Sequence, residues 1–200
     1  MAFNLQKIGT GEKFSLKKSF GLDEIRVELT WEGADLDIQA WLLSAGGTIV
    51  NDEAFVFYNS ENRTEAYDRA VHGTKANYLK STRPMSADGA VLGAKDEVKG
   101  GIETINITLS KVDAAVNEIL ISATIYEECG SFSQAKDAKV TIIDEQTGDA
   151  LCCYELTSDY QTEDACVIGR FVINNDGEWE FNAMGDGYNG GLQTLVEMYT

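Results

Sequence analysis

The sequence predicts an all-β protein: a two-sheet β-sandwich built from two related halves, with short helical segments in one loop and at the C-terminus. Apolar and polar residues alternate with a period of two through several short segments, which is the pattern of strands with one buried face. Turn signals such as Gly46-Gly47, Gly100-Gly101 and Asn175-Asp176-Gly177 separate these segments, as in antiparallel sheets. Many short antiparallel strands of this kind are typical of a β-sandwich.

The first two strands are the most regular. Over 24–30 the apolar residues Ile25, Val27 and Leu29 alternate with charged and polar residues. Over 36–42 apolar residues alternate in the same way, which places Asp35, Asp37 and Gln39 on the opposite face of the strand. Further strands are predicted at 55–58, 103–109, 119–126, 139–144, 151–156, 166–173 and 178–183, with a hairpin turn at 174–177.

Two segments depart from the β pattern. Residues 60–86 are polar and contain the only histidine and the only proline. They form a long insertion loop, in which we expect a short helix around 61–71. At the C-terminus, apolar residues at 192, 195, 196 and 199 have helical spacing, so we expect a short helix after Gly190-Gly191.

A weak internal repeat relates two parts of the chain. The segment Glu24–Trp31 resembles Glu118–Ile125, and each is followed by acidic residues and a second β-rich run. We therefore expect two related halves that pack face to face as the two sheets. With 200 residues, the chain is long enough for one sizeable core, and we expect a single domain over 1–200.

The net charge restricts the partners. The chain has 16 Lys and Arg against 33 Asp and Glu, a net charge of −17, and beyond Asp144 the only basic residue is Arg170. Nucleic acid and anionic membrane surfaces repel such a chain, so neither is expected as a partner. Two interpretations of the charge stay open: a negative surface that confers solubility, and a site for divalent cations.

The N-terminal residues lack the continuous apolar stretch of a secretory signal, and no segment approaches the roughly 20 apolar residues that cross a bilayer. We therefore expect a cytoplasmic protein without membrane insertion. Cys129, Cys152, Cys153 and Cys166 fit buried reduced thiols better than zinc ligands, because no C-x-x-C pair occurs and His72 is the only histidine. The sequence also lacks the G-x-S-x-G, Walker and G-x-G-x-x-G motifs, so we expect no enzyme and no catalytic residues.

Asp35 and Asp37 are the most suggestive candidate metal ligands. Residues i and i+2 of a strand share a face, with Cα atoms roughly 6.5–7 Å apart. Two carboxylates can therefore converge on one ion while Leu36 enters the core. A divalent cation relieves the repulsion between them, whereas a solvated strand face is the alternative explanation for such a pair.

Further oxygen ligands are available at loop positions. Asn59 follows the predicted strand 55–58, and Asp88, Asp96, Glu97 and Glu103 lie in or next to a glycine-containing loop. Their spacing does not match an EF-hand, so the site is expected to be composite, built from separated segments. Ca²⁺ takes six to eight oxygen ligands in flexible geometry, whereas Mg²⁺ demands a rigid octahedron. Ca²⁺ is therefore the expected cofactor.

Five stretches carry a family resemblance across nearly the whole chain. They are WEGADLDIQAWLL (31–43), DEAFVFYN (52–59), SADGAV (86–91), YELTSDYQTEDACVIGRF (154–171) and EWEFNAMGDGYNGGL (178–192). In this order they resemble the TerD family of tellurium-resistance and general-stress proteins. The resemblance implies a β-sandwich of two related halves that binds Ca²⁺ through acidic residues of the D-L-D strand and the acidic glycine loop.

Residue by residue, the resemblance supports Asp35, Asp37, Asn59, Asp96 and Glu103. This chain departs from the family pattern next to Asp96. It reads AKDE at 94–97 where members usually have a G-D-N run, and VKGGIE at 98–103 where they have T-G-x-G-x-G-D-D-E. Two acidic residues are thereby missing and a lysine at 95 is added, which argues against a second Ca²⁺ site here.

The expected function is that of a non-catalytic Ca²⁺-binding stress-response protein of the tellurium-resistance type. In this hypothesis the cation orders a scaffold that contacts other proteins of a stress complex, or a second copy. One alternative is a structural or assembly component whose oligomerisation depends on Ca²⁺ and uses residues 60–86. Another is a metal-dependent hydrolase that uses the carboxylates around a cation. A thiol role in tellurite detoxification is the weakest alternative, because the dense negative charge around the cysteines raises thiol pKa values.

Overall fold

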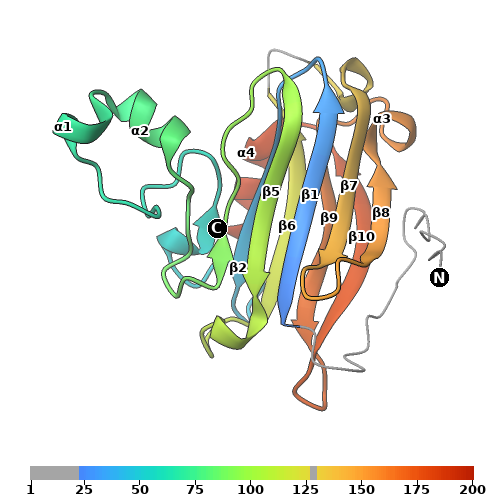
Figure 1. Cartoon of the computed structure of the whole chain (residues 1–200). Coiled ribbons are helices and arrows are strands. Elements are labelled where there is room, and N and C mark those ends of the chain that lie inside the picture. The colour runs from blue at the N-terminus through green and yellow to red at the C-terminus, as the bar shows by residue number, and fades with distance from the viewer. Residues whose placement is uncertain (1–22, 127–129) are drawn as a thin grey trace.

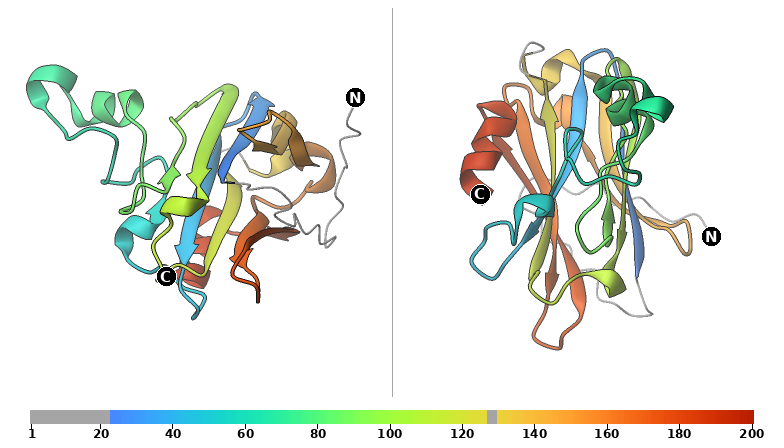
Figure 2. Two further views of the ribbon diagram at one scale, coloured as in Figure 1. Left: turned by 60° about the horizontal axis from the view of Figure 1, so that its bottom comes forward. Right: turned by 90° about the vertical axis from the view of Figure 1, so that its left-hand side faces the viewer.

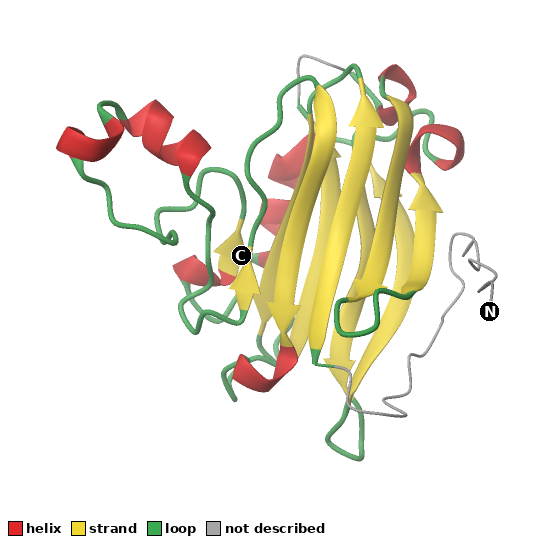
Figure 3. Cartoon of the chain, viewed as in Figure 1, coloured by secondary structure: helices red, strands yellow, loops and turns green. Residues whose placement is uncertain are grey.

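Two five-stranded antiparallel sheets stack face to face in the computed structural model, which describes residues 23–126 and 130–200 (Figures 1 and 3). One sheet has the strand order β4-β5-β1-β7-β8 and the other β10-β9-β6-β2-β3. The predicted β-sandwich is thereby confirmed. The strands are β1 (Glu24–Glu32), β2 (Leu36–Leu43), β3 (Phe55–Val56), β4 (Val91–Leu92), β5 (Gly100–Thr108), β6 (Glu118–Ile125), β7 (Lys136–Asp144), β8 (Ala150–Glu155), β9 (Ala165–Ile173) and β10 (Trp179–Tyr188).

Each sheet contains strands from both halves of the chain. β7 and β8 of the second half join β1, β4 and β5, whereas β2 and β3 of the first half join β6, β9 and β10. The expectation that each half forms one sheet is therefore wrong. Alternation shows which face of a strand is buried, but it does not show which sheet the strand joins. β1 and β6, the two segments of the internal repeat, each occupy the centre of a sheet, which agrees with two related halves.

The main core lies between the two sheets. β1 contributes Ile25, Val27 and Leu29, and β6 contributes Ile119 and Ile121. The buried residues of β1 alternate with partly exposed ones along the strand, as its sequence pattern predicts. Burial of this apolar surface is the main driving force for stacking the two sheets.

The sheet that contains β2 is also covered on its outer face. Helix α4 (Gly191–Tyr199) confirms the predicted C-terminal helix, and its Leu195 belongs to a second apolar cluster with Trp41 and Leu120. All eight residues of β2 are buried. Several polar groups on this face are paired with one another: the Gln39 amide donates to Thr124 Oγ1 at 2.8 Å. The outer face of β2 is therefore a second buried region, which contains both apolar and polar side chains.

An arm, here defined as residues 61–83, projects from the edge of the sandwich between β3 and β4 (Figures 1 and 2). It carries two short helices, α1 (Arg69–His72) and α2 (Lys75–Ser81), which confirms the predicted helical segments in this loop. The position expected for a single helix, around 61–71, is wrong. Asp68 accepts a hydrogen bond from the Ala70 amide at 2.8 Å, and Thr74 accepts one from the Asn77 amide at 3.2 Å. These N-caps fix where the two helices begin.

β3 has two residues, whereas the sequence predicts a strand over 55–58. The chain turns after Val56 because Ser60 Oγ accepts a hydrogen bond from the Phe57 amide at 3.0 Å and donates one to the Phe55 carbonyl at 2.9 Å. The other predicted strands are present with shifted ends, and β4 is a strand that the sequence pattern did not indicate.

The remaining elements are short. They are η1 (Asp52–Ala54), η2 (Leu109–Lys111), η4 (Phe132–Gln134) and α3 (Leu156–Asp159). The hairpin predicted at 174–177 is confirmed: the Asn174 amide donates to the Glu178 carbonyl at 2.8 Å, and Gly177 adopts a φ of 78° that favours glycine. Among the described residues no helix is long and apolar enough to cross a membrane.

Cys153 and Cys166 are buried and free, as predicted for reduced thiols. Burial is the main cause that raises the pKa of the Cys166 thiol to about 12, which makes this residue a poor nucleophile at neutral pH. Cys129 and the side chain of Cys152 lie outside the described part of the protein.

Candidate metal centre

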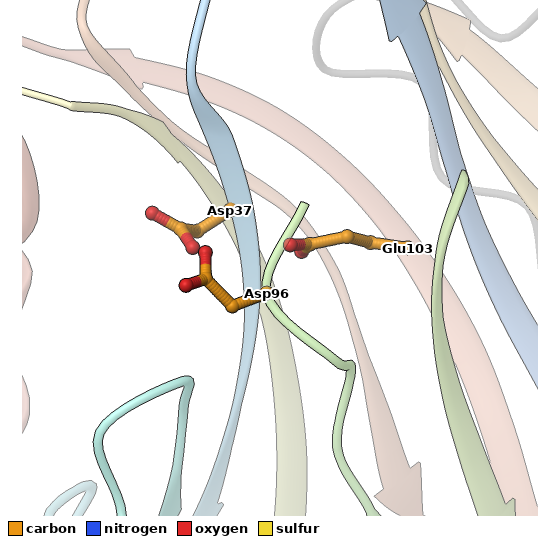
Figure 4. Close-up of side chains that lie close together, drawn as sticks. All are labelled: Asp37, Asp96 and Glu103. Carbon is orange, nitrogen blue, oxygen red and sulfur yellow. The ribbon is translucent and has the colours of Figure 1, made fainter. Parts of the chain in front are cut away.

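Three carboxylates from separate segments meet at one end of the sandwich (Figure 4). Asp37, Asp96 and Glu103 each offer an oxygen atom, and these atoms all lie within 4.8 Å of one another. Asp37 belongs to β2, Glu103 to β5 of the opposite sheet, and Asp96 to the loop that leads into β5. The cluster is thus composite, as the sequence predicts, and it joins the two sheets.

The crossing from β1 to β2 positions Asp37. Gly33 adopts a φ of 97°, and Trp31 Nε1 donates to the Ala34 carbonyl at 2.6 Å, which stabilises this tight connection. β2 begins at Leu36, whose side chain is fully buried in the main core. Asp37 then points to the outer face, as alternation requires, yet it is only 7% exposed.

Glu103 reaches from one sheet to the other. It lies on the same face of β5 as Ile105 and Ile107, which is the face toward the core, and it is 2% exposed. One carboxylate oxygen accepts a hydrogen bond from the Ile38 amide at 3.0 Å, and the other accepts one from the Glu97 amide at 3.3 Å. β3 pairs with β2 only at Ala40 and Trp41, so the Ile38 amide lies beyond that pairing. Glu103 satisfies it.

The electrostatics of the cluster disfavour three bare negative charges. Burial, together with the charges of Asp35 and Asp96, raises the pKa of Asp37 to about 7. Burial and the charge of Asp37 raise the pKa of Glu103 to about 9, although the two backbone hydrogen bonds act in the opposite direction. Protonation or a bound cation removes this repulsion.

Asp35 adds to the negative potential next to the cluster. Burial and the charge of Asp96 raise its pKa, and its Oδ1 atom is buried without a hydrogen-bond partner among the described residues. The guanidinium of Arg63 is close enough for its pKa to respond to Asp96. Its N–H groups, however, donate to Thr82 and to backbone carbonyls, so Arg63 forms no ion pair with the cluster.

This donor set fits a hard divalent cation. Three carboxylates supply up to six oxygen atoms, and the unpartnered Oδ1 of Asp35 is a further buried oxygen near them. Hard cations such as Ca²⁺ and Mg²⁺ prefer oxygen ligands, and Ca²⁺ tolerates irregular sets that combine side chains and carbonyl groups. The residues present therefore fit the cation that the family resemblance implies.

Two other predicted ligands, Asn59 and Glu97, have exposed side chains. Asn59 is exposed in the turn closed by Phe57 and Ser60, and the Glu97 side chain is exposed although its amide contacts Glu103. Both remain predictions as ligands.

Asp88 lies elsewhere. Its oxygens accept hydrogen bonds from Ser86, Ala90 and Asp113 at 2.6–2.9 Å. It lines a pocket with Leu42, five residues along β2 from Asp37, a strand distance of roughly 16 Å. The structure therefore does not bring Asp88 to the carboxylate cluster.

Tyr58 is a neighbour of the centre that the sequence pattern did not single out. Burial raises its pKa, and the charges of Asp37, Tyr126, Asp96 and Asp35 act in the same direction. Tyr58 also ends a row of aromatic contacts. The ring centroids of Trp41 and Phe55 lie 3.8 Å apart, those of Phe55 and Phe57 lie 4.2 Å apart, and Phe57 packs edge-on against Tyr58. Only its position next to Asn59 could have indicated this role.

Comparison with known proteins identifies the family. A family model described as the TerD domain matches residues 1–199. The chain belongs to the TerD family. The tellurium resistance protein TerD of Serratia marcescens is 30% identical over 100% of this chain and 97% of its own length. General stress protein 16U of Bacillus subtilis is 29% identical over 96% of this chain and 95% of its own length.

The fold of this TerD-family protein also matches a solved structure. The crystal structure of a homologue of the telluride resistance protein (TerD) from Streptomyces coelicolor superposes with a TM-score of 0.67 over 88% of this chain and 96% of that one. Its sequence identity is 17%, so the match supports the sandwich fold alone. The resemblance carried by the sequence motifs is confirmed.

Proposed function

We propose that this TerD-family protein is a non-catalytic Ca²⁺-binding stress-response protein of the tellurium-resistance type. Asp37, Asp96 and Glu103 hold the ion, and Asp35 adds negative charge beside it. The observation that carries the proposal is the convergence of three carboxylate oxygens within 4.8 Å, two of them on side chains that are almost completely buried. The cation-ordered surface then serves as a scaffold for other proteins of a stress complex.

Such a site would stabilise the protein because the ion connects three separate segments of the chain. A cation bound to Asp37, Asp96 and Glu103 ties β2, β5 and the loop before β5 together. It binds the folded arrangement of acids and hardly binds the dispersed unfolded ones, so it stabilises the fold. It also orders the loop surface that a protein partner meets.

Metal-stripped protein titrated calorimetrically with Ca²⁺ and with Mg²⁺ tests this proposal. We expect saturable binding with a preference for Ca²⁺, and loss of binding in Asp37→Asn and Glu103→Gln. Asp186→Asn is the matched control, because Asp186 lies on β10, outside the cluster. Equal Ca²⁺ affinity in all three variants and the parent protein contradicts the assignment.

A catalytic role has less support. His72 packs against Tyr67 and Tyr78 on the arm, and the cluster of the described residues consists of carboxylates alone. A hydrolase that uses the bound cation is tested by a substrate-turnover screen with Ca²⁺ or Mn²⁺, in which we expect no turnover. The projecting arm favours assembly as the second candidate function.

A further inference from the structure

The arm is an ordered projection that its own hydrogen bonds and side-chain packing hold in shape. The guanidinium of Arg63 fastens its base, with Nη2 donating to the carbonyls of Leu79 and Thr82 at 2.7 and 2.8 Å. Tyr78 is 2% exposed and packs edge-on against His72 and Tyr67, and its hydroxyl donates to the Glu65 carbonyl at 2.7 Å. The arm thus has a small core of its own, and both of its helices are capped. Such a preorganised element loses little conformational entropy when it binds a partner.

The arm has a small net positive charge in an otherwise acidic protein. The arm contains five Lys and Arg against three Asp and Glu, whereas the chain as a whole has a net charge of −17. Arg69 and Lys80 are exposed, and among the described residues no carboxylate lies within ion-pair distance of either. The surface also displays apolar groups, since Val71 is 72% exposed and Tyr67 42%. Charge plus exposed apolar side chains is the composition of a docking surface.

The opposite edge of the sandwich offers a complementary surface. An open hollow of about 400 Å³ is lined by Asp159, Glu163 and Asp186, with Tyr160 and Tyr188 beside them. Asp159 ends α3, which follows the edge strand β8, and Asp186 lies on the edge strand β10. The sequence around this hollow is the acidic part of the chain, in which Arg170 is the only base. Carboxylates and tyrosine rings together accept lysine and arginine side chains.

The two surfaces lie on different edges of one molecule. The arm emerges between β3 and β4, which are edge strands on one side, whereas β8 and β10 form the other side (Figures 1 and 2). The arm therefore points away from its own hollow, and a contact between the two surfaces needs two molecules.

We propose that the arm of one copy docks into the acidic hollow of a second copy. Arg69 and Lys80 meet the carboxylates of the hollow, and Val71 supplies apolar contact. Because the two surfaces differ and lie on opposite edges, the contact is head-to-tail and repeats, which joins copies edge to edge in a row. A second copy is the fitting partner because it carries the acidic surface that the basic arm matches.

Light scattering over a range of protein concentrations at low salt tests the contact. In EDTA we expect the apparent mass to rise above the 21.9 kDa of one chain with increasing concentration, and to fall back to one chain in about 0.5 M salt, where exposed charges are screened. Arg69→Glu/Lys80→Glu is expected to stay at the mass of one chain. Lys111→Glu/Lys136→Glu changes the net charge equally away from the arm and should associate like the parent. A parent protein that stays a single chain at every concentration, or two double variants that associate equally, overturns the proposal.

A mixing experiment identifies the two surfaces. Arg69→Glu/Lys80→Glu keeps its hollow, and Glu163→Gln/Asp186→Asn keeps its arm, so each variant alone is expected to be a single chain. Mixed together, they should form a one-to-one complex, because one arm and one hollow remain intact. Failure of the mixture to associate overturns docking in the hollow. Association in EDTA does not involve the metal centre, so this result is separate from the outcome of the Ca²⁺ titrations.

Discussion

The protein has two acid-rich regions that differ in the burial of their carboxylates. At the candidate metal centre Asp37 and Glu103 are 7% and 2% exposed. In the hollow beside β10, Asp159 is exposed, and Glu163 and Asp186 are partly exposed. Both regions are acidic in the sequence, but only the first brings three carboxylate oxygens within 4.8 Å among the described residues.

The difference shows that burial, more than the number of acidic residues, decides how strongly a group of carboxylates favours a bound cation. Exposed carboxylates are solvated and screened, so their mutual repulsion is small. Buried carboxylates lose this hydration and interact strongly, and a cation is then worth more to the fold. The carboxylate cluster is therefore suited to binding an ion, whereas the hollow is suited to reversible contacts with basic side chains.

The largest effect that would sharpen this comparison is the response to Ca²⁺. At a concentration 100 times its Kd, Ca²⁺ should stabilise the parent protein by about 2.7 kcal/mol, which raises the melting temperature by roughly 5–10 °C for a chain of this size. Calorimetric melting in EDTA and in Ca²⁺ measures the shift. We expect Asp37→Asn to lose it and Asp186→Asn to keep it. A shift lost in Asp186→Asn but kept in Asp37→Asn would reverse the roles of the two regions.

Much of the fold follows from the sequence because the central strands are half-buried. In β1 the buried Ile25, Val27 and Leu29 alternate with less buried residues, and this period of two is visible in the amino-acid sequence. The exchange of strands between the sheets is not visible there, since β2 and β7 would show the same alternation in either sheet. β3 and the arm helices depend on single side chains such as Ser60 and Thr74, whose hydrogen bonds the general pattern does not predict.

The candidate metal centre is predictable in part. Strand spacing indicates Asp37 as a ligand, whereas the prediction of Asp96 and Glu103 depends on the acidic glycine loop and the family resemblance. The sequence places the acids on the face of β2 opposite the main core, but it does not reveal that α4 and the aromatic side chains cover that sheet face. Asp88 shares the glycine loop with Asp96, yet its hydrogen bonds to the Ala90 and Asp113 amides keep it at the other end of β2.

The second effect is a pH dependence of the metal-free protein. The pKa of Asp37 is about 7 and that of Glu103 about 9 in the folded state, whereas unfolded carboxyl groups titrate near 4. The folded state therefore binds more protons in between, and stability is lost as pH rises from about 5 through the folded pKa values. Allowing for relaxation around buried charges, we expect a loss of about 2 kcal/mol between pH 5 and 8. Urea unfolding in EDTA measures it.

Two comparisons control this pH experiment. Saturating Ca²⁺ should abolish the loss above pH 7, because the ion keeps the carboxylates ionised and compensated. Asp186→Asn should show the same pH dependence as the parent, since this residue lies outside the cluster. A metal-free protein that becomes more stable between pH 5 and 8 is incompatible with buried, uncompensated carboxylates at this site.

A third effect is smaller: a substitution of a buried residue that raises the unfolding free energy, whereas most such substitutions lower it. Asp37→Asn removes one buried charge while it keeps the shape of the side chain. In EDTA at pH 8 we expect a gain in unfolding free energy of about 1 kcal/mol. The same substitution at Asp186 should change stability by less than about 0.5 kcal/mol, as is usual for surface positions. If Asp37→Asn destabilises the metal-free protein, then its carboxylate makes a favourable contact in the absence of the ion.

The smallest effect concerns the lysine that departs from the family pattern. Lys95 is exposed and adjoins Asp96 in the chain, so its positive charge opposes an approaching Ca²⁺ ion through solvent. Interactions of exposed charges are weak at this range, so Lys95→Gln should tighten Ca²⁺ binding by only about twofold at low salt. Because solvent ions screen the interaction, the difference should vanish in about 0.5 M salt. Lys111→Gln, which changes the net charge equally on η2, should leave the affinity unchanged. If both substitutions tighten binding alike, the ion responds to the net charge of the whole protein, and the local burial that separates the two acidic regions then explains less of its affinity.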